Sequence, residues 1–122
     1  MSAERETEVA ADSGADRVID MVGEPIDVEA ERRVLIDLLI YAFDRARSPG
    51  VCERLTAGMA ATGVRVIRPD GAVFDPGVHE AGSVEPTSDP LLHNKIVKTE
   101  SVGFVDRGRL IREPVVVVYQ LH

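Results

Sequence analysis

The hydrophobic pattern divides the chain into a helical part and an extended part. From Asp27, a suitable N-cap, residues 28–47 run without Gly or Pro and repeat apolar side chains at helical spacing. Ser48-Pro49-Gly50 ends that segment and begins a second helix, because Ser is a good N-cap and Pro suits the first helical position. Gly63 lies where a C-terminal glycine cap belongs. Residues 27–62 are therefore predicted to form a helical hairpin.

The first predicted helix carries more apolar surface than one neighbour can cover. Five apolar residues form one stripe, and Ile36, Tyr41 and Phe43 place further apolar groups on other faces. Packing against both the second helix and a second subunit would cover these faces, so we expect the hairpin to form a homodimer. Burial wholly within a monomer stays open as the alternative. The predicted dimerisation residues are Val34, Leu35, Leu38, Leu39 and Ala42.

After Gly63 the period of the pattern becomes extended. A turn at residues 68–71 follows the first strand, and residues 105–108 join two later ones. The run 115–118 is apolar on both faces, which predicts a central strand covered on two sides. We therefore predict an α+β fold, in which the helical hairpin precedes a small all-β head at 63–122. The predicted strands are 64–67, 78–84, 96–104, 109–111 and 115–119.

Charge separates the N-terminal segment from the rest of the chain. Residues 1–31 hold ten acidic and two basic side chains, whereas the other 91 residues hold 11 acidic and 12 basic ones. Residues 1–26 contain too few apolar groups to offset the entropy of ordering, so they are predicted to be a disordered acidic arm. Neither part offers a basic stripe for a phosphate backbone, and nucleic acid is not an expected partner.

Composition also narrows the chemistry. Cys52 is the single cysteine, too few for an internal disulfide or a cysteine zinc site, and it is interpreted as a buried filler. No secretory signal and no run of about 20 apolar residues is seen, so we expect a soluble, cytoplasmic protein without a membrane partner. His79, Asp75 and Glu80 match no metal-ligand spacing, and no catalytic triad or phosphate loop is found. An enzyme is therefore not expected, nor is a cofactor.

Several short motifs in the extended part follow one another in a specific order. They are Phe74-Asp75-Pro76-x-x-His79-x-Ala81, then Gly103-Phe104, then Gly108-Arg109-Leu110-Ile111-Arg112 and the valine strand. In this order, residues 63–118 resemble the C-terminal part of the GrpE-type nucleotide exchange factors. Arg109 and Arg112, three positions apart, would point to opposite faces of a regular strand, so one of them would be available to a partner or would simply be a solvated edge residue.

The resemblance implies a cofactor-free homodimer that binds the ATPase domain of a DnaK-type chaperone. The β head would favour the open cleft of that domain and so promote ADP release, with no bond made or broken by the factor itself. The resemblance places the partner-binding surface at the hairpin around Gly108 and on the valine strand after it. The residues predicted to bind the partner are Phe104, Gly108, Arg109, Arg112 and Val116.

Two features depart from the family pattern. Gly23 and Pro25 interrupt any helix ahead of Asp27, where the family has a long N-terminal stalk helix, and Glu113 stands where a small residue or Pro is usual. A non-exchanging adaptor is therefore the alternative hypothesis. Such an adaptor would use the head as a docking module and the acidic arm to recruit another protein.

Overall fold

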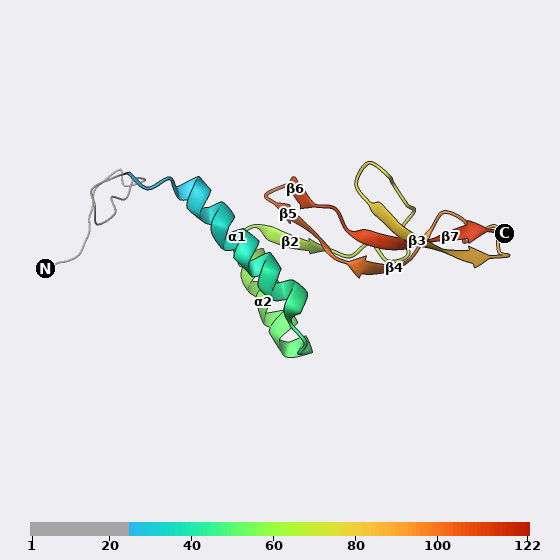
Figure 1. Cartoon of the computed structure of the whole chain (residues 1–122), viewed down its shortest axis with the longest axis horizontal. Helices are drawn as coiled ribbons and strands as arrows, with labels where there is room; N and C mark the ends of the chain where they lie inside the picture. Colours follow the sequence, from blue (N-terminus) through green and yellow to red (C-terminus); the bar gives the residue numbers. More distant parts are fainter. Residues whose placement is uncertain (1–24) are drawn as a thin grey trace, which may run out of the picture. The chain divides into compact units, whose positions relative to one another are not determined.

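A computed structural model of the 122-residue chain describes residues 25–122. Its described part contains two helices followed by six strands in two three-stranded sheets (Figure 1). This confirms the predicted α+β fold, whereas the predicted acidic arm lies almost wholly outside the described residues. The elements are α1 (Val28–Arg45), α2 (Pro49–Ala61), β2 (Val64–Ile67), β3 (Glu80–Thr87), β4 (Ile96–Ser101), β5 (Gly103–Asp106), β6 (Arg109–Arg112) and β7 (Val115–Leu121).

Both helices begin at the predicted N-caps; α1 ends at Arg45, two residues before its predicted end, and α2 ends at Ala61, just before the predicted glycine cap. The Asp27 carboxylate accepts a hydrogen bond from the Ala30 N–H at 3.1 Å, which satisfies one of the free donors at the start of α1. The Ser48 hydroxyl accepts from the backbone of α2 in the same way. Gly63 follows α2 with a φ of 93°, a conformation that glycine adopts without steric cost. In residues 25–122, neither helix is long and apolar enough to cross a membrane.

The chain divides into two compact units between Phe43 and Asp44. Among the described residues, the first unit consists of α1 up to Phe43, and the second contains α2 and both sheets. Within the second unit α2 contacts β2, and Met59 and Val64 are both buried. The domain boundary predicted after residue 62 and the packing of the helices as a hairpin stay predictions.

The two sheets of the second unit differ in topology. One has the order β2-β5-β6 and is antiparallel throughout, and the other has the order β3-β7-β4, with β3 parallel to β7. The consecutive residues Val116, Val117 and Val118 are all buried, and successive side chains of a strand point to opposite faces. Both faces of β7 are therefore covered, which confirms the predicted central strand.

The strand predicted over residues 96–104 is wrong in one respect, because the structure divides it into β4 and β5. The chain leaves one sheet at Val102 and enters the other at Gly103, where it meets the return crossing at Pro114. A Cβ on Gly103 would lie 2.6 Å from Cδ of Pro114 and 2.7 Å from the carbonyl oxygen of Arg112. Only glycine fits where the two crossings approach this closely.

The Phe74–His79 motif forms a closed turn rather than the start of a strand. The Asp75 carbonyl oxygen accepts from the N–H groups of Val78 (3.0 Å) and His79 (2.8 Å), and the Asp75 carboxylate accepts from Gly77 at 2.9 Å. His79 closes the turn, because its Nδ1 accepts from the Asp75 N–H at 2.9 Å. The strand predicted at 78–84 therefore begins only at Glu80 and extends to Thr87.

Candidate partner-binding surface

The β5–β6 hairpin ends in a rigid two-residue turn. Arg107 and Gly108 have φ angles of 51° and 86°, and positive values at both positions are what a type I′ hairpin turn requires. The flanking residues Asp106 and Arg109 face each other across the strands. The Arg107 N–H also donates to the Gly63 carbonyl oxygen at 2.9 Å, which ties the tip of the hairpin to the end of α2. The turn therefore holds Gly108 and Arg109, both exposed, in a fixed position.

A β-bulge changes which faces the two arginines occupy. Phe104 lies opposite Arg112, whereas the next residue of β5, Val105, lies opposite Leu110, so that Ile111 is the extra residue. Arg109 lies opposite Asp106 and Arg112 opposite Phe104, and these two positions of β5 share one face. The alternation expected for a regular strand is therefore wrong here, and Arg109 and Arg112 lie on the same face of the sheet.

The five predicted partner-binding residues have very different exposure. Gly108 and Arg109 are exposed at the hairpin tip, whereas Phe104 and Val116 are fully buried. Phe104 lies in β5 of the hairpin beneath the Arg112 guanidinium, and Val116 belongs to the core with Ile96 and Val118. These two residues therefore have no exposed area with which to contact a partner.

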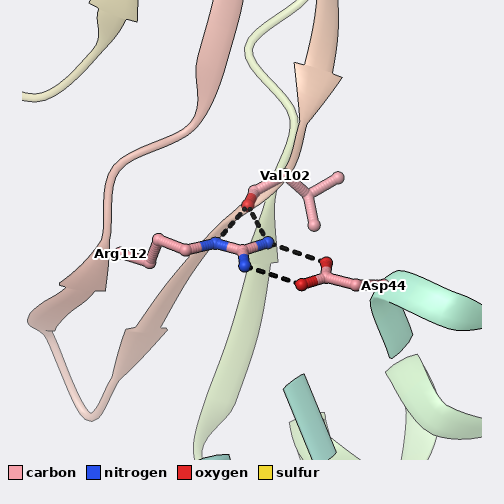
Figure 2. Close-up of polar contacts among 3 residues, drawn as sticks. All are labelled: Asp44, Val102 and Arg112. Carbon is pink, nitrogen blue, oxygen red and sulfur yellow. Dashed lines mark hydrogen bonds and ion pairs between the residues drawn. The ribbon is translucent and has the colours of Figure 1, made fainter. Parts of the chain in front are cut away.

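The fifth predicted residue, Arg112, is engaged within its own chain. Its Nη1 and Nη2 donate to Oδ2 and Oδ1 of Asp44 at 2.8 and 2.9 Å, a bidentate pair (Figure 2). Nε and Nη2 both donate to the Val102 carbonyl oxygen, at 3.1 and 2.8 Å. The guanidinium carbon also lies 5.0 Å from the centre of the Phe104 ring, within cation–π range. Arg112 thus contacts three separate parts of the second unit.

The Asp44–Arg112 pair shifts the pKa of both groups. Hydrogen bonding to Arg112 lowers the pKa of the Asp44 carboxyl; partial burial opposes this effect, and the charges of Arg112 and Arg45 add to it. Hydrogen bonding to Asp44 correspondingly raises the pKa of Arg112. Since the two side chains are 34% and 32% exposed, water screens the pair, and it contributes on the order of 1 kcal/mol or less to folding.

The opposite face of the β2-β5-β6 sheet carries a row of residues that the sequence reasoning did not select. Arg65 pairs with Val105, and Val105 pairs with Leu110, so the three side chains cross the sheet on one face. Arg65 is exposed, Val105 is half-buried and Leu110 is 41% exposed. The alternation in β2, where Val64 is buried and Arg65 exposed, is the signal that could have indicated this face. We call Arg65, Val105 and Leu110 the outer row.

The predicted dimerisation residues lie on α1 and belong to the first unit. Val34, Leu35, Leu38 and Ala42 are exposed and Leu39 is half-buried, while Ile36 between them is buried. The described part of the chain therefore presents an apolar helix stripe of the composition expected for a subunit contact. The dimer itself stays a prediction.

Comparison with known proteins places the second unit in a family. A family model described as GrpE matches residues 50–120, from α2 almost to the end of β7, which is more than half of the chain. The chain belongs to the GrpE family. The predicted family is thus confirmed, and the hairpin and the outer row both lie inside the matched region.

Curated members of the GrpE family align with about half of the chain. Protein GrpE of Trichormus variabilis is 32% identical to it, over 54% of this chain and 34% of the relative. Protein GrpE of Chromohalobacter salexigens is 37% identical, over 51% of this chain and 29% of the relative. The chain therefore matches about a third of the length of these relatives.

Proposed function

We propose that this GrpE-family chain is a co-chaperone that binds the ATPase domain of a DnaK-type chaperone and promotes ADP release. The observation that carries the proposal is the exposed, rigid Gly108-Arg109 tip within the segment that the GrpE family model matches. A tip held by the turn and by the Arg107–Gly63 hydrogen bond loses little freedom on binding, so its contacts contribute to affinity with a small entropic cost.

The proposed mechanism needs no reactive group on this chain. A head that binds the open ATPase domain more tightly than the closed one shifts the population toward the open form, from which ADP dissociates. We propose that Gly108 and Arg109, at the tip of the hairpin, make part of this contact and that the outer row of Arg65, Val105 and Leu110, on the face opposite the Arg109 side chain, makes the rest. In this contact Leu110 would be the apolar residue that the partner buries, with Arg65 at its rim.

We further propose that the chain acts as a cytoplasmic homodimer, joined through the apolar stripe on α1. Val34, Leu35 and Leu38 leave that stripe exposed in one protomer, and a second copy would cover it. Size-exclusion chromatography with light scattering should give a dimer mass, and Leu38→Asp should give a monomer mass because it places a charge in the interface. A monomer mass for the unaltered protein at micromolar concentration would contradict the dimer.

Release of a fluorescent ADP analogue from a DnaK-type chaperone tests the exchange activity. The unaltered protein should accelerate release, and Arg109→Ala should reduce the acceleration about tenfold, the effect of losing roughly 1.4 kcal/mol at a contact residue. Arg68→Ala is the matched control, because Arg68 is also an exposed head arginine but lies in the turn after β2. It should leave the rate unchanged.

The second candidate function is the non-exchanging adaptor. It is motivated by Gly23 and Pro25, which interrupt any helix directly ahead of Asp27, where the family pattern has a long helix. Binding to the chaperone without faster ADP release would support the adaptor. Absence of both binding and acceleration would count against a DnaK-type partner altogether.

A further inference from the structure

Three connections join the two sheets of the second unit, and two of them meet at one place. Val102 connects β4 to β5, and Glu113-Pro114 connects β6 to β7. Between these two connections the chain forms the β5–β6 hairpin, and a third connection, residues 68–79, leads from β2 to β3. The close approach of Gly103 to Pro114 shows that the two crossings touch. Since the two sheets share no strand, their relative direction depends in part on what holds this junction.

Arg112 is the side chain that holds the junction. Val102, in the first of these connections, is buried, and its carbonyl oxygen accepts two hydrogen bonds from the Arg112 guanidinium (Figure 2). A buried carbonyl left unpaired is costly, so this arrangement favours the observed path of the crossing. The same guanidinium lies over Phe104 of β5 and pairs with Asp44 in the last turn of α1.

The geometry requires arginine in particular. The planar guanidinium offers five N–H donors in a fixed fork, and here it donates in two directions at once, to the Asp44 carboxylate and to the Val102 carbonyl. A lysine ammonium would keep the charge but could not reproduce both the bidentate pair and the hydrogen bonds to Val102. The contact is therefore suited to fixing an orientation.

We propose that Arg112 is a positioning residue for partner recognition. By binding both the sheet junction and Asp44, it fixes the orientation of the hairpin tip relative to the β3-β7-β4 sheet. The effect on partner recognition rests on the proposed function, whereas the effect on the junction does not. Because both side chains of the Asp44–Arg112 pair are about one-third exposed, loss of the pair should lower the free energy of unfolding only slightly. Its main effect should be on the orientation of the two sheets relative to one another.

Residual dipolar couplings of the backbone amides measure the relation between the two sheets directly. In the unaltered chain the couplings of both sheets should fit one alignment tensor. In Arg112→Lys each sheet should keep its own fold but require a separate or weaker tensor, and affinity for the ADP-bound chaperone should fall about three- to tenfold.

Asp44→Asn retains an acceptor oxygen, so its couplings and its affinity should lie between those of the unaltered chain and Arg112→Lys. Arg33→Lys is the control, because Arg33 pairs with Asp37 at 3.1 Å on α1 and both side chains are more than half exposed.

A pH series separates a positioning role from general destabilisation. Arg112, with a weaker contribution from Arg45, lowers the pKa of Asp44, so the pair is intact above the ordinary aspartate pKa of about 4 and is lost as the pH falls below it. Both proteins are measured at the same pH values. Below a pH of about 4 the couplings of the unaltered protein should approach those of Asp44→Asn, and at neutral pH the two sets should differ. Since other carboxyl groups titrate there too, the comparison with Asp44→Asn isolates the contribution of this pair.

Each outcome bears on one proposal at a time. If Arg112→Lys keeps a single alignment tensor at neutral pH, the positioning role is overturned, whatever happens to binding. If the tensors separate but affinity is unchanged, the junction is locked by Arg112 without consequence for the partner, and the recognition part of the proposal fails. If the unaltered protein does not bind the chaperone, the proposed function fails while the couplings still test the junction.

Discussion

Replacing Gly103 by alanine should destabilise the head by about 3 kcal/mol or more, the largest stability effect that we expect from one added methyl group. The new Cβ would lie 2.6 Å from Cδ of Pro114, 2.7 Å from the Arg112 carbonyl oxygen and 2.8 Å from the Pro114 nitrogen. Two of these neighbours are backbone atoms and the third is a proline ring, so none can rotate away. Gly103 also pairs with Ile67 of β2, so the backbone at Gly103 cannot move away from Pro114 without disturbing that pairing.

Urea unfolding followed by circular dichroism measures the effect of this substitution. Gly58→Ala is the matched control, because a Cβ at Gly58 in α2 meets no atom within 4 Å. That change should stabilise the protein by roughly 0.5–1 kcal/mol, since alanine favours the helix relative to glycine. Equal unfolding midpoints for Gly103→Ala and the unaltered protein would show that the sheet junction is not closely packed.

Replacing Leu110 by aspartate should weaken partner binding by about 30-fold or more while leaving the fold intact. Leu110 is 41% exposed in the outer row, so a charge there costs little in the free protein. In the proposed complex, however, the carboxylate would lose its water against the partner without an established counter-charge. Binding of the labelled protein to the ADP-bound chaperone measures the change.

Leu91→Asp is the control for this substitution. Leu91 is 79% exposed and lies in the loop between β3 and β4, outside the outer row and the hairpin. It should bind like the unaltered protein. Equal losses in the two variants would point to a general effect of added negative charge, and full binding by Leu110→Asp would remove the outer row from the proposed surface.

The local elements were predictable because their signals lie within a few residues of one another. Asp27 and Ser48 cap their helices with hydrogen bonds to residues three positions away, and Gly63 follows α2 where a glycine cap was expected. The motifs that carry the resemblance to the GrpE family are local signals of the same kind. The Phe74–His79 motif closes on itself through hydrogen bonds that span two to four residues.

The candidate surface was predicted only in part. The sequence indicated the Gly108-Arg109 tip, because a glycine turn between two short strands is a local signal. It also selected Phe104 and Val116, which are buried, and it left out Leu110. The omission of Leu110 follows from the bulge at Ile111, which changes the faces of the side chains on β6 and is visible only from the pairing with β5.

By itself the sequence determined the helices, most of the strands, the α+β order and the GrpE family. Tertiary structure alone decided where the strand from Ile96 breaks, which face of β6 each side chain occupies and what Arg112 contacts. Its partner Asp44 is 68 positions away in the chain, and Val102 is ten away. Helical caps and turns depend on neighbours along the chain, whereas these three features depend on groups that become neighbours only when the two sheets form.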